Sequence, residues 1–193
     1  MHLPPHHFAT KTAVELAQEL IGCELHSQLG GVHTAGIITE TEAYHEDERG
    51  CHAYGGKRTK RTEIMFAEGG VAYIYLCYGM HHLFNVVCAQ KGRAEAVLIR
   101  AIEPIIGTKL MLKRRNQKKV GKKLTAGPAR LSQALGITTD LNKISLKPPQ
   151  IWIEERKTDY IQIDKSPRIG IDYAENDALL PYRFTLRDSI WIT

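Results

Sequence analysis

Residues 37–44 read Ile37-Ile38-Thr39-Glu40-Thr41-Glu42-Ala43-Tyr44, an apolar strand pattern that runs into two carboxylates and an aromatic ring. Side chains alternate between the two faces of an extended chain, so we expect the even-numbered residues 38 to 44 on one face and the odd-numbered ones on the other. A carboxylate and a ring two residues apart on one strand face can form one wall of a pocket. The segment therefore predicts both a central strand and part of a binding site.

Working outward, the pattern predicts mostly strands joined by short turns, with a few helices. A capping box at Thr12 and Glu15 indicates a helix that ends near Gly22, and Gly30-Gly31 suits a tight turn into the strand above. Further helices are expected at 108–116 and 128–136. Strands are expected at 71–77, 84–89, 96–102, 151–154, 161–163, 168–173 and 183–186. Since strands outnumber helices and turns are short, we predict an α+β fold built on a curved, mainly antiparallel sheet with peripheral helices.

The totals describe an ordinary globular protein. The 193 residues suit a single domain spanning 1–193, and 43% of them are hydrophobic and 24% charged. No apolar run approaches the roughly 18 residues that a membrane helix needs, so no membrane partner is expected. The N-terminal residues lack the pattern of a signal peptide. These features predict a cytoplasmic protein.

Charge is unevenly distributed along the chain. Eight basic residues and no acidic one lie between Lys109 and Lys123, within a formal net charge of +5. Such a cluster favours a polyanion such as nucleic acid, although a solvated helix end followed by a loop would look the same. The four cysteines form no Cys-x-x-Cys pair, so they are expected to be free thiols and not zinc or iron–sulfur ligands.

Arg100 and Glu42 are the first candidates for chemistry. Arg100 interrupts the apolar strand 96–102, and a guanidinium buried there needs an anionic partner, since leaving it unpaired costs on the order of 3–5 kcal/mol. Glu40 and Glu42 are the candidate partners. The pairing could be purely structural, or Arg100 could orient Glu42 as a general base that activates water.

Aromatic and polar residues nearby suggest a pocket for a flat ring. Tyr44, His52 and Tyr75 offer stacking surfaces with polar edges, although tyrosines at alternate strand positions are often ordinary cross-strand packing. The histidines and acids around residues 40–52, and the pair His81-His82, match no metal-ligand spacing. Glycine motifs for nucleotide triphosphates or dinucleotides are absent from the sequence, so neither a catalytic metal nor an organic cofactor is expected.

Several longer blocks resemble the 3-methyladenine (alkyladenine) DNA glycosylase family. They occur in the order of the family from about residue 12 to the C-terminus, and they include some long and unusual motifs. The blocks are Glu40–Tyr44, His52–Gly56, Arg61 with Met65-Phe66, Tyr73–Met80 with Asn85–Val87, Val97–Pro104, Gly127–Leu131, Pro167–Gly170 and Arg183-Phe184.

The resemblance implies a role for each matching residue. Glu42 would deprotonate the attacking water, and Arg100 would support it. Tyr44, His52 and Tyr75 would enclose a base rotated out of the duplex, Asn85 would disfavour the exocyclic amine of guanine, and Tyr78 would wedge into the vacated space. Leu98 would be a supporting pocket contact, and Met65, Arg61 and Arg130 would contact DNA.

The resemblance therefore implies a monomeric, cofactor-free and monofunctional glycosylase. It would excise alkylated or deaminated purines from double-stranded DNA, as in base excision repair, and leave an abasic site. Three positions depart from the usual family pattern and leave substrate preference open: Cys51 before the pocket histidine, Arg130 in place of a lysine, and His81-His82 after the wedge. Two other classes of protein are alternatives. A non-catalytic DNA-binding domain would not need Glu42, and a metal-dependent hydrolase or nuclease would be sensitive to chelators.

Overall fold

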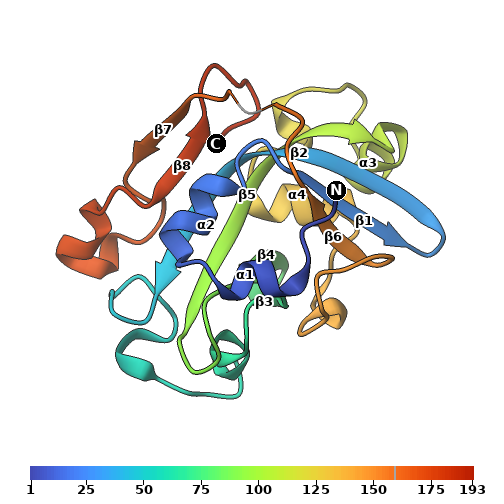
Figure 1. The fold of residues 1–193 in the computed structure, drawn as a ribbon. Coiled ribbons are helices and arrows are strands. Elements are labelled where there is room, and N and C mark those ends of the chain that lie inside the picture. Colours follow the sequence, from blue (N-terminus) through green and yellow to red (C-terminus); the bar gives the residue numbers. More distant parts are fainter. Residues whose placement is uncertain (159) are drawn as a thin grey trace.

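The protein, described by a computed structural model over residues 1–158 and 160–193, is built around an open sheet in which every strand pair is antiparallel (Figure 1). Six strands follow the order β3-β4-β5-β2-β1-β6, and β8 pairs with both β2 and β7. The strands are β1 Glu24–Leu29, β2 Val32–His45, β3 Ala72–Cys77, β4 His81–Val87, β5 Glu95–Ile106, β6 Ile151–Glu154, β7 Ile163–Ser166 and β8 Arg183–Leu186. The α+β prediction is confirmed.

Strand β2 is the centre of this sheet, because it pairs with three others. It runs beside β5 along most of its length, while its other edge is shared by β1 near the start and β8 near the end. The pairing with β5 is irregular between Ile38 and Thr41, where Glu40 lies opposite Ala101. Bulges of this kind re-aim side chains. Accordingly, Ile38 packs in the main hydrophobic core and does not line the cavity described below, unlike Tyr44.

Short helices lie around the sheet. The α-helices are α1 Pro5–Ala9, α2 Ala13–Glu19, α3 Thr108–Arg114 and α4 Pro128–Leu135, and the 3-10 segments are 54–56, 63–66, 122–124, 139–141 and 172–179. The predicted capping box is present at the start of α2, where Thr12 and Glu15 satisfy each other's backbone N–H groups. Helix α2 packs on β2, and the Thr41 hydroxyl donates to the Ala17 carbonyl at 2.7 Å. This helix therefore covers the face of β2 that carries Thr41.

Two clusters form the hydrophobic core. The larger one joins α2, α4 and the sheet, with Leu16, Ile99 and Phe184 among its fully buried members. The smaller one, around Met65, Tyr73 and Val87, lies beneath the loop that follows β2. The loop after β2 therefore packs on this smaller cluster, and members of the cluster such as Met65 and Tyr73 also form one side of the candidate site.

Turns are mostly where the glycines predicted them. Gly30 and Gly31, both with positive φ, connect β1 to β2, and Gly136 ends α4 in a left-handed conformation. Strand β5 extends to Ile106, beyond the predicted end at Ile102 and through Pro104. The chain therefore stays extended longer than the proline suggested.

The predicted strand at 168–173 is wrong. Gly170 has φ +77°, and 3-10 turns begin at Asp172. The Ile169 N–H donates to the Glu42 carboxylate at 2.7 Å instead of joining a strand ladder. The strand expected at 161–163 is also displaced, since β7 spans Ile163–Ser166.

Within the described residues, no helix is long and apolar enough to cross a membrane.

Candidate active site

A cavity of about 410 Å³ opens where the end of β2, the β3–β4 hairpin and β5 meet the loops after β2 and β7. Its lining is mixed, with tyrosines, an arginine pair and apolar side chains. Nine of the eleven site residues predicted from the sequence line this cavity, and two of these nine, Tyr78 and Arg61, lie at its rim. The other two are Glu42, which lies directly behind the lining, and Arg130, which lies outside it. The lining residues used below are Tyr44, His52, Arg61, Met65, Tyr75, Tyr78, Asn85, Leu98, Arg100 and Ile169.

Arg100 bridges the two carboxylates of β2, as the sequence suggested. Its Nε donates to Glu40 Oε1 at 2.9 Å, and its Nη1 donates to Glu42 Oε2 at 3.2 Å. Both carboxylates are fully buried, and the Arg100 side chain is only 8% exposed. Glu40 is also held by Arg183, whose Nε lies 2.7 Å from Oε1, and by the Thr193 N–H. A buried charge cluster of this kind is fixed in place by its mutual hydrogen bonds.

Glu42 lies behind the cavity wall, and the groups that bind it line the cavity. Its Oε2 accepts from the Tyr44 hydroxyl at 2.8 Å as well as from Arg100, and its Oε1 accepts from the Ile169 N–H. Glu42 itself is fully buried and is not among the lining residues. Among the residues that the structure describes, one N–H donates to Oε1, so this oxygen keeps acceptor capacity.

The charge states follow from burial and pairing. Burial, together with the charge of Glu42, raises the pKa of Tyr44 well above its usual range, so this hydroxyl stays protonated and donates to Glu42. Burial opposes ionisation of Arg100, but Glu42 and Glu40 outweigh it and raise its pKa. For Glu40, burial is likewise outweighed by hydrogen bonds from Thr193 and the charge of Arg100, and the pKa falls. The carboxylate of Glu40 is thus stabilised in its ionised form.

His52 and Tyr75 form a second aromatic wall. The two rings meet edge to face with centroids 4.8 Å apart, and the Arg61 guanidinium lies 4.5 Å from the centre of the Tyr75 ring. His52 Nδ1 lies 2.9 Å from the Tyr73 hydroxyl. Burial and the nearby charge of Arg61 lower the pKa of His52 to about 4, so the imidazole is neutral at physiological pH.

Three buried residues complete the lining. Met65 and Leu98 supply apolar contacts at 2% and 4% exposure. The Asn85 amide Nδ2 donates to the carbonyls of Tyr73 and Leu83, at 3.0 and 3.4 Å, which fixes the orientation of the side chain. The structure therefore brings these three predicted residues to the same cavity.

Tyr78 stands at the rim of the cavity, at the tip of the β3–β4 hairpin. It is 91% exposed and has φ +51°, in the left-handed region that side chains rarely adopt. Arg130 does not reach the main cavity. It lies on α4 beside a second hollow of about 210 Å³ that is also lined by Tyr78. The two residues thus flank the cavity on the outside of the molecule.

Sequence reasoning missed the side chain that supports Tyr44 from behind. The Arg168 guanidinium lies 4.6 Å from the Tyr44 ring centre and pairs with buried Glu48, with Nη2 to Oε2 at 2.7 Å. Its Nη1 also donates to the Ala43 carbonyl. The Pro167–Gly170 block was visible in the sequence, but nothing in that block indicates a partner more than a hundred residues away.

None of the metal groupings considered from the sequence forms at the cavity. Among the described residues, the one group of three or more His, Cys, Asp or Glu side chains with ligand atoms close enough to share an ion is Glu24, His26 and Glu154. These residues lie on β1 and β6 and do not line the cavity.

The fold and site can now be compared with known proteins. The sequence profile of the methylpurine-DNA glycosylase family matches residues 7–190. Proteins of Chlamydia felis (48% identical, covering 95% of each chain), Bacillus cereus strain AH187 (42%, 95% of each) and Clostridium acetobutylicum (40%, 93% of this chain and 92% of the relative) each carry the name "Putative 3-methyladenine DNA glycosylase".

The chain therefore belongs to the methylpurine-DNA glycosylase family. It is a hydrolase of the DNA glycosylase class, of the 3-methyladenine or methylpurine type, and DNA is its substrate. This confirms the resemblance stated from the sequence motifs.

Proposed function

We propose that the protein rotates alkylated or deaminated purines out of duplex DNA into the 410 Å³ cavity and hydrolyses the N-glycosidic bond with a water activated by Glu42. The product would be an abasic site. The observation that carries this proposal is the buried Glu42 carboxylate, whose three protein partners all line the cavity.

A base inside a duplex is out of reach of any side chain, so it must be extruded at a cost of about a few kcal/mol. The exposed Tyr78 is suited to fill the space that the base leaves, which offsets part of this cost. Inside the cavity, Tyr44, Tyr75 and His52 provide aromatic surfaces for the ring. Asn85, held by two backbone carbonyls, would read the edge of the base.

Cleavage of the bond passes through an oxocarbenium-like sugar. Ionised Glu42 would stabilise that positive charge and polarise water through the free capacity of Oε1, while Arg100 and the Tyr44 hydroxyl keep Oε2 in place. Alkylated purines such as 3-methyladenine already carry positive charge and leave without strong acid help. No lysine is among the residues that line the cavity, which supports a monofunctional enzyme with no Schiff-base step. We expect the enzyme to act as a monomer in the cytoplasm, and on the nucleoid if it is bacterial.

The decisive experiment compares wild type with Glu42→Gln on alkylated DNA and on duplexes that contain hypoxanthine. Release of free base should fall by about 10² to 10⁴ in the variant, the usual contribution of a general base. Glu46→Gln is the matched control. It also removes a carboxylate paired to an arginine, Arg93, but it lies outside the cavity and should retain full activity.

Two outcomes would contradict the proposal. Equal release by wild type and Glu42→Gln, both folded by circular dichroism, would place the water activator elsewhere. Absence of release by wild type, together with tight binding to damaged duplexes, would favour a non-catalytic binding module.

A further inference from the structure

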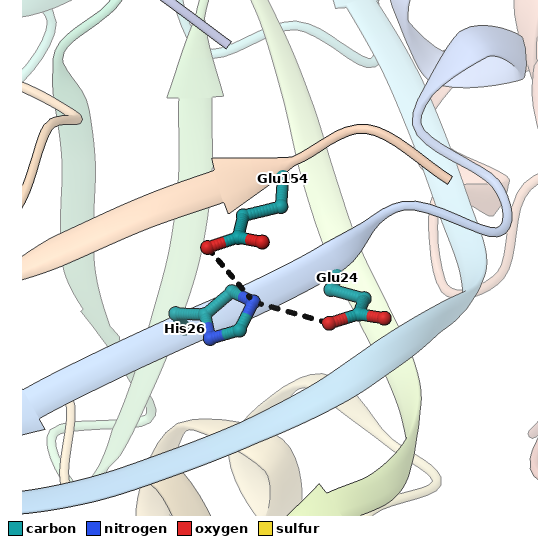
Figure 2. A group of neighbouring side chains, drawn as sticks. All are labelled: Glu24, His26 and Glu154. Atoms are coloured by element: carbon teal, nitrogen blue, oxygen red, sulfur yellow. Dashed lines mark ion pairs between the residues drawn. The ribbon is translucent and has the colours of Figure 1, made fainter. Parts of the chain in front are cut away.

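A second polar cluster lies on the other side of β2 in the strand order, where β1 meets the edge strand β6. Glu24 and His26 are two residues apart on β1, and Glu24 lies directly opposite Glu154 of β6. Figure 2 shows both carboxylates turned toward the His26 imidazole. One ligand atom from each of the three residues lies within 4.8 Å of the others.

The His26 Nε2 atom is the unexplained feature of this cluster. The side chain is 5% exposed, and Nε2 is buried without a hydrogen-bond partner among the described residues. It points between Glu24 Oε2 at 3.4 Å and Glu154 Oε1 at 3.8 Å. A buried polar atom left unsatisfied costs about 1–3 kcal/mol, so its position calls for a partner.

The contact of the other His26 ring nitrogen, Nδ1, indicates what kind of partner suits Nε2. His26 Nδ1 lies 3.0 Å from His33 Nε2, so one of the two histidines donates to the other. If His26 donates, its Nε2 lone pair faces two carboxylates with no positive charge between them. A cation seated between Nε2 and the carboxylates would satisfy all three groups.

We propose that Glu24, His26 and Glu154 bind a divalent transition-metal ion such as Zn²⁺, at a structural site distinct from the glycosylase cavity. One imidazole and two carboxylates are ligands that Zn²⁺ accepts, at about 2.0–2.2 Å, with a fourth position left for water. The Glu154 side chain is 36% exposed, which gives the ion an entry path and gives this ligand freedom to close in.

The surroundings match those of metal ligands. The Trp152 indole N–H donates to Glu154 Oε1 at 2.9 Å, and its ring stacks on His26 at 4.9 Å with an angle of 9° between the planes. Such outer contacts orient ligands toward a metal. Lys157 Nζ binds the other oxygen of Glu24 at 2.7 Å, but its side chain is 82% exposed and leaves Oε2 free. The ion would cross-link β6, a strand of only four residues, to β1 through side chains and so stabilise their pairing.

The test is calorimetric titration of Zn²⁺ into protein that has been treated with a chelator and then freed of it. Wild type should bind one equivalent, and a hundredfold excess over the dissociation constant should raise the unfolding temperature by about 5–10 °C. Glu154→Gln should lose this response. Glu154 is chosen over His26 because its side chain is partly exposed, so its substitution disturbs the fold less. His6→Ala, at an exposed histidine outside the cluster, should behave as wild type.

The outcome is separable from the glycosylase reaction, because Glu154 lies outside the cavity. Wild type and Glu154→Gln should release base at equal rates at 25 °C, with or without chelator. Absence of Zn²⁺ binding by wild type, or Zn²⁺ binding by Glu154→Gln that equals that of wild type, would overturn the proposed site and leave the glycosylase assignment untouched.

Discussion

The role proposed for Glu42 needs a carboxylate that is both fully buried and ionised, two requirements that usually conflict. The structure surrounds this carboxylate with three donors: a guanidinium, a phenol that stays protonated and a backbone N–H. Arg100 also donates to Glu40, and Glu40 in turn accepts from Arg183. Substitution of Arg100 therefore affects two carboxylates together, and its effects cannot be ascribed to Glu42 alone.

His52 provides a pH prediction at the scale of a single residue. Its pKa is about 4 in the folded protein and about 6.5 when unfolded, so between these values only the unfolded chain takes up the proton. Stability should therefore fall as the pH drops from about 6.5 toward 4, by up to about 3 kcal/mol at 1.36 kcal/mol per unit.

The measurement is urea unfolding of wild type and His52→Gln across this pH range. The variant should lose stability less steeply, because glutamine does not titrate. Parallel curves for the two proteins would show that His52 does not carry the low pKa.

Where the signal was local, the sequence predicted which residues lie together at the candidate site. An arginine in an apolar strand and a carboxylate two residues before a tyrosine were sufficient to point to Arg100 and Glu42. Arg168 and the Ile169 N–H were missed, because their roles depend on contacts with Tyr44 and Glu42 across more than a hundred residues. Periodicity within 168–173 suggested a strand, but the hydrogen bond to Glu42 takes the place of a ladder there.

At the scale of elements, the β3–β4 hairpin places Tyr78 under local strain. Its φ of +51° suits glycine better than tyrosine, and the side chain is 91% exposed, so the fold gains little from it. Backbone strain of this kind often marks a functional position.

Tyr78→Gly should therefore separate stability from function. The free energy of unfolding should stay the same or rise by about 1 kcal/mol, because a left-handed residue becomes glycine. Base release and affinity for damaged duplexes should both fall, because the wedge is gone. Thermal unfolding and a duplex-binding titration measure the two effects, and Met80→Ala, also exposed at the tip, is the control. Undiminished affinity and turnover would rule out Tyr78 as the wedge.

Element boundaries were predictable where glycine or a capping box marks them, as at Thr12 and at Gly30-Gly31. They were not predictable where pairing partners extend a strand. Strand β5 continues to Ile106 because the start of β2 lies beside it and supplies hydrogen bonds as far as Ala35. Pairing of this kind is invisible in a single segment.

At the scale of the whole molecule, the basic segment 109–123 divides into two parts. Arg114 and Arg115 donate to the carbonyls of Ala134 and Leu124, which makes them structural. The lysines at 118, 119, 122 and 123 are exposed and carry charge toward solvent. If these exposed lysines meet DNA phosphates, they release counterions on binding.

We predict that the double variant Lys118→Gln with Lys119→Gln binds DNA with a weaker salt dependence. The slope of the logarithm of the association constant against the logarithm of the salt concentration should become less steep by up to about 2, at roughly 0.9 per phosphate contact. Lys91→Gln with Lys147→Gln removes the same net charge at exposed positions elsewhere and should change the slope less. Duplex binding at several salt concentrations measures both. Equal slopes for the two double variants would mean that Lys118 and Lys119 do not contact DNA phosphates.

The hydrogen bond from Ile169 to Glu42 spans 127 residues of chain. During synthesis at about 5–20 residues per second, the segment that carries Glu42 is made roughly 6–25 s before the one that holds it. Arg183 and Thr193, which hold Glu40, are made later still. A nascent chain thus carries Glu42 with Tyr44, and later Arg100, beside it well before the Ile169 N–H has been made, so the hydrogen bonds that hold the Glu42 carboxylate are complete only after residue 169 has been synthesised.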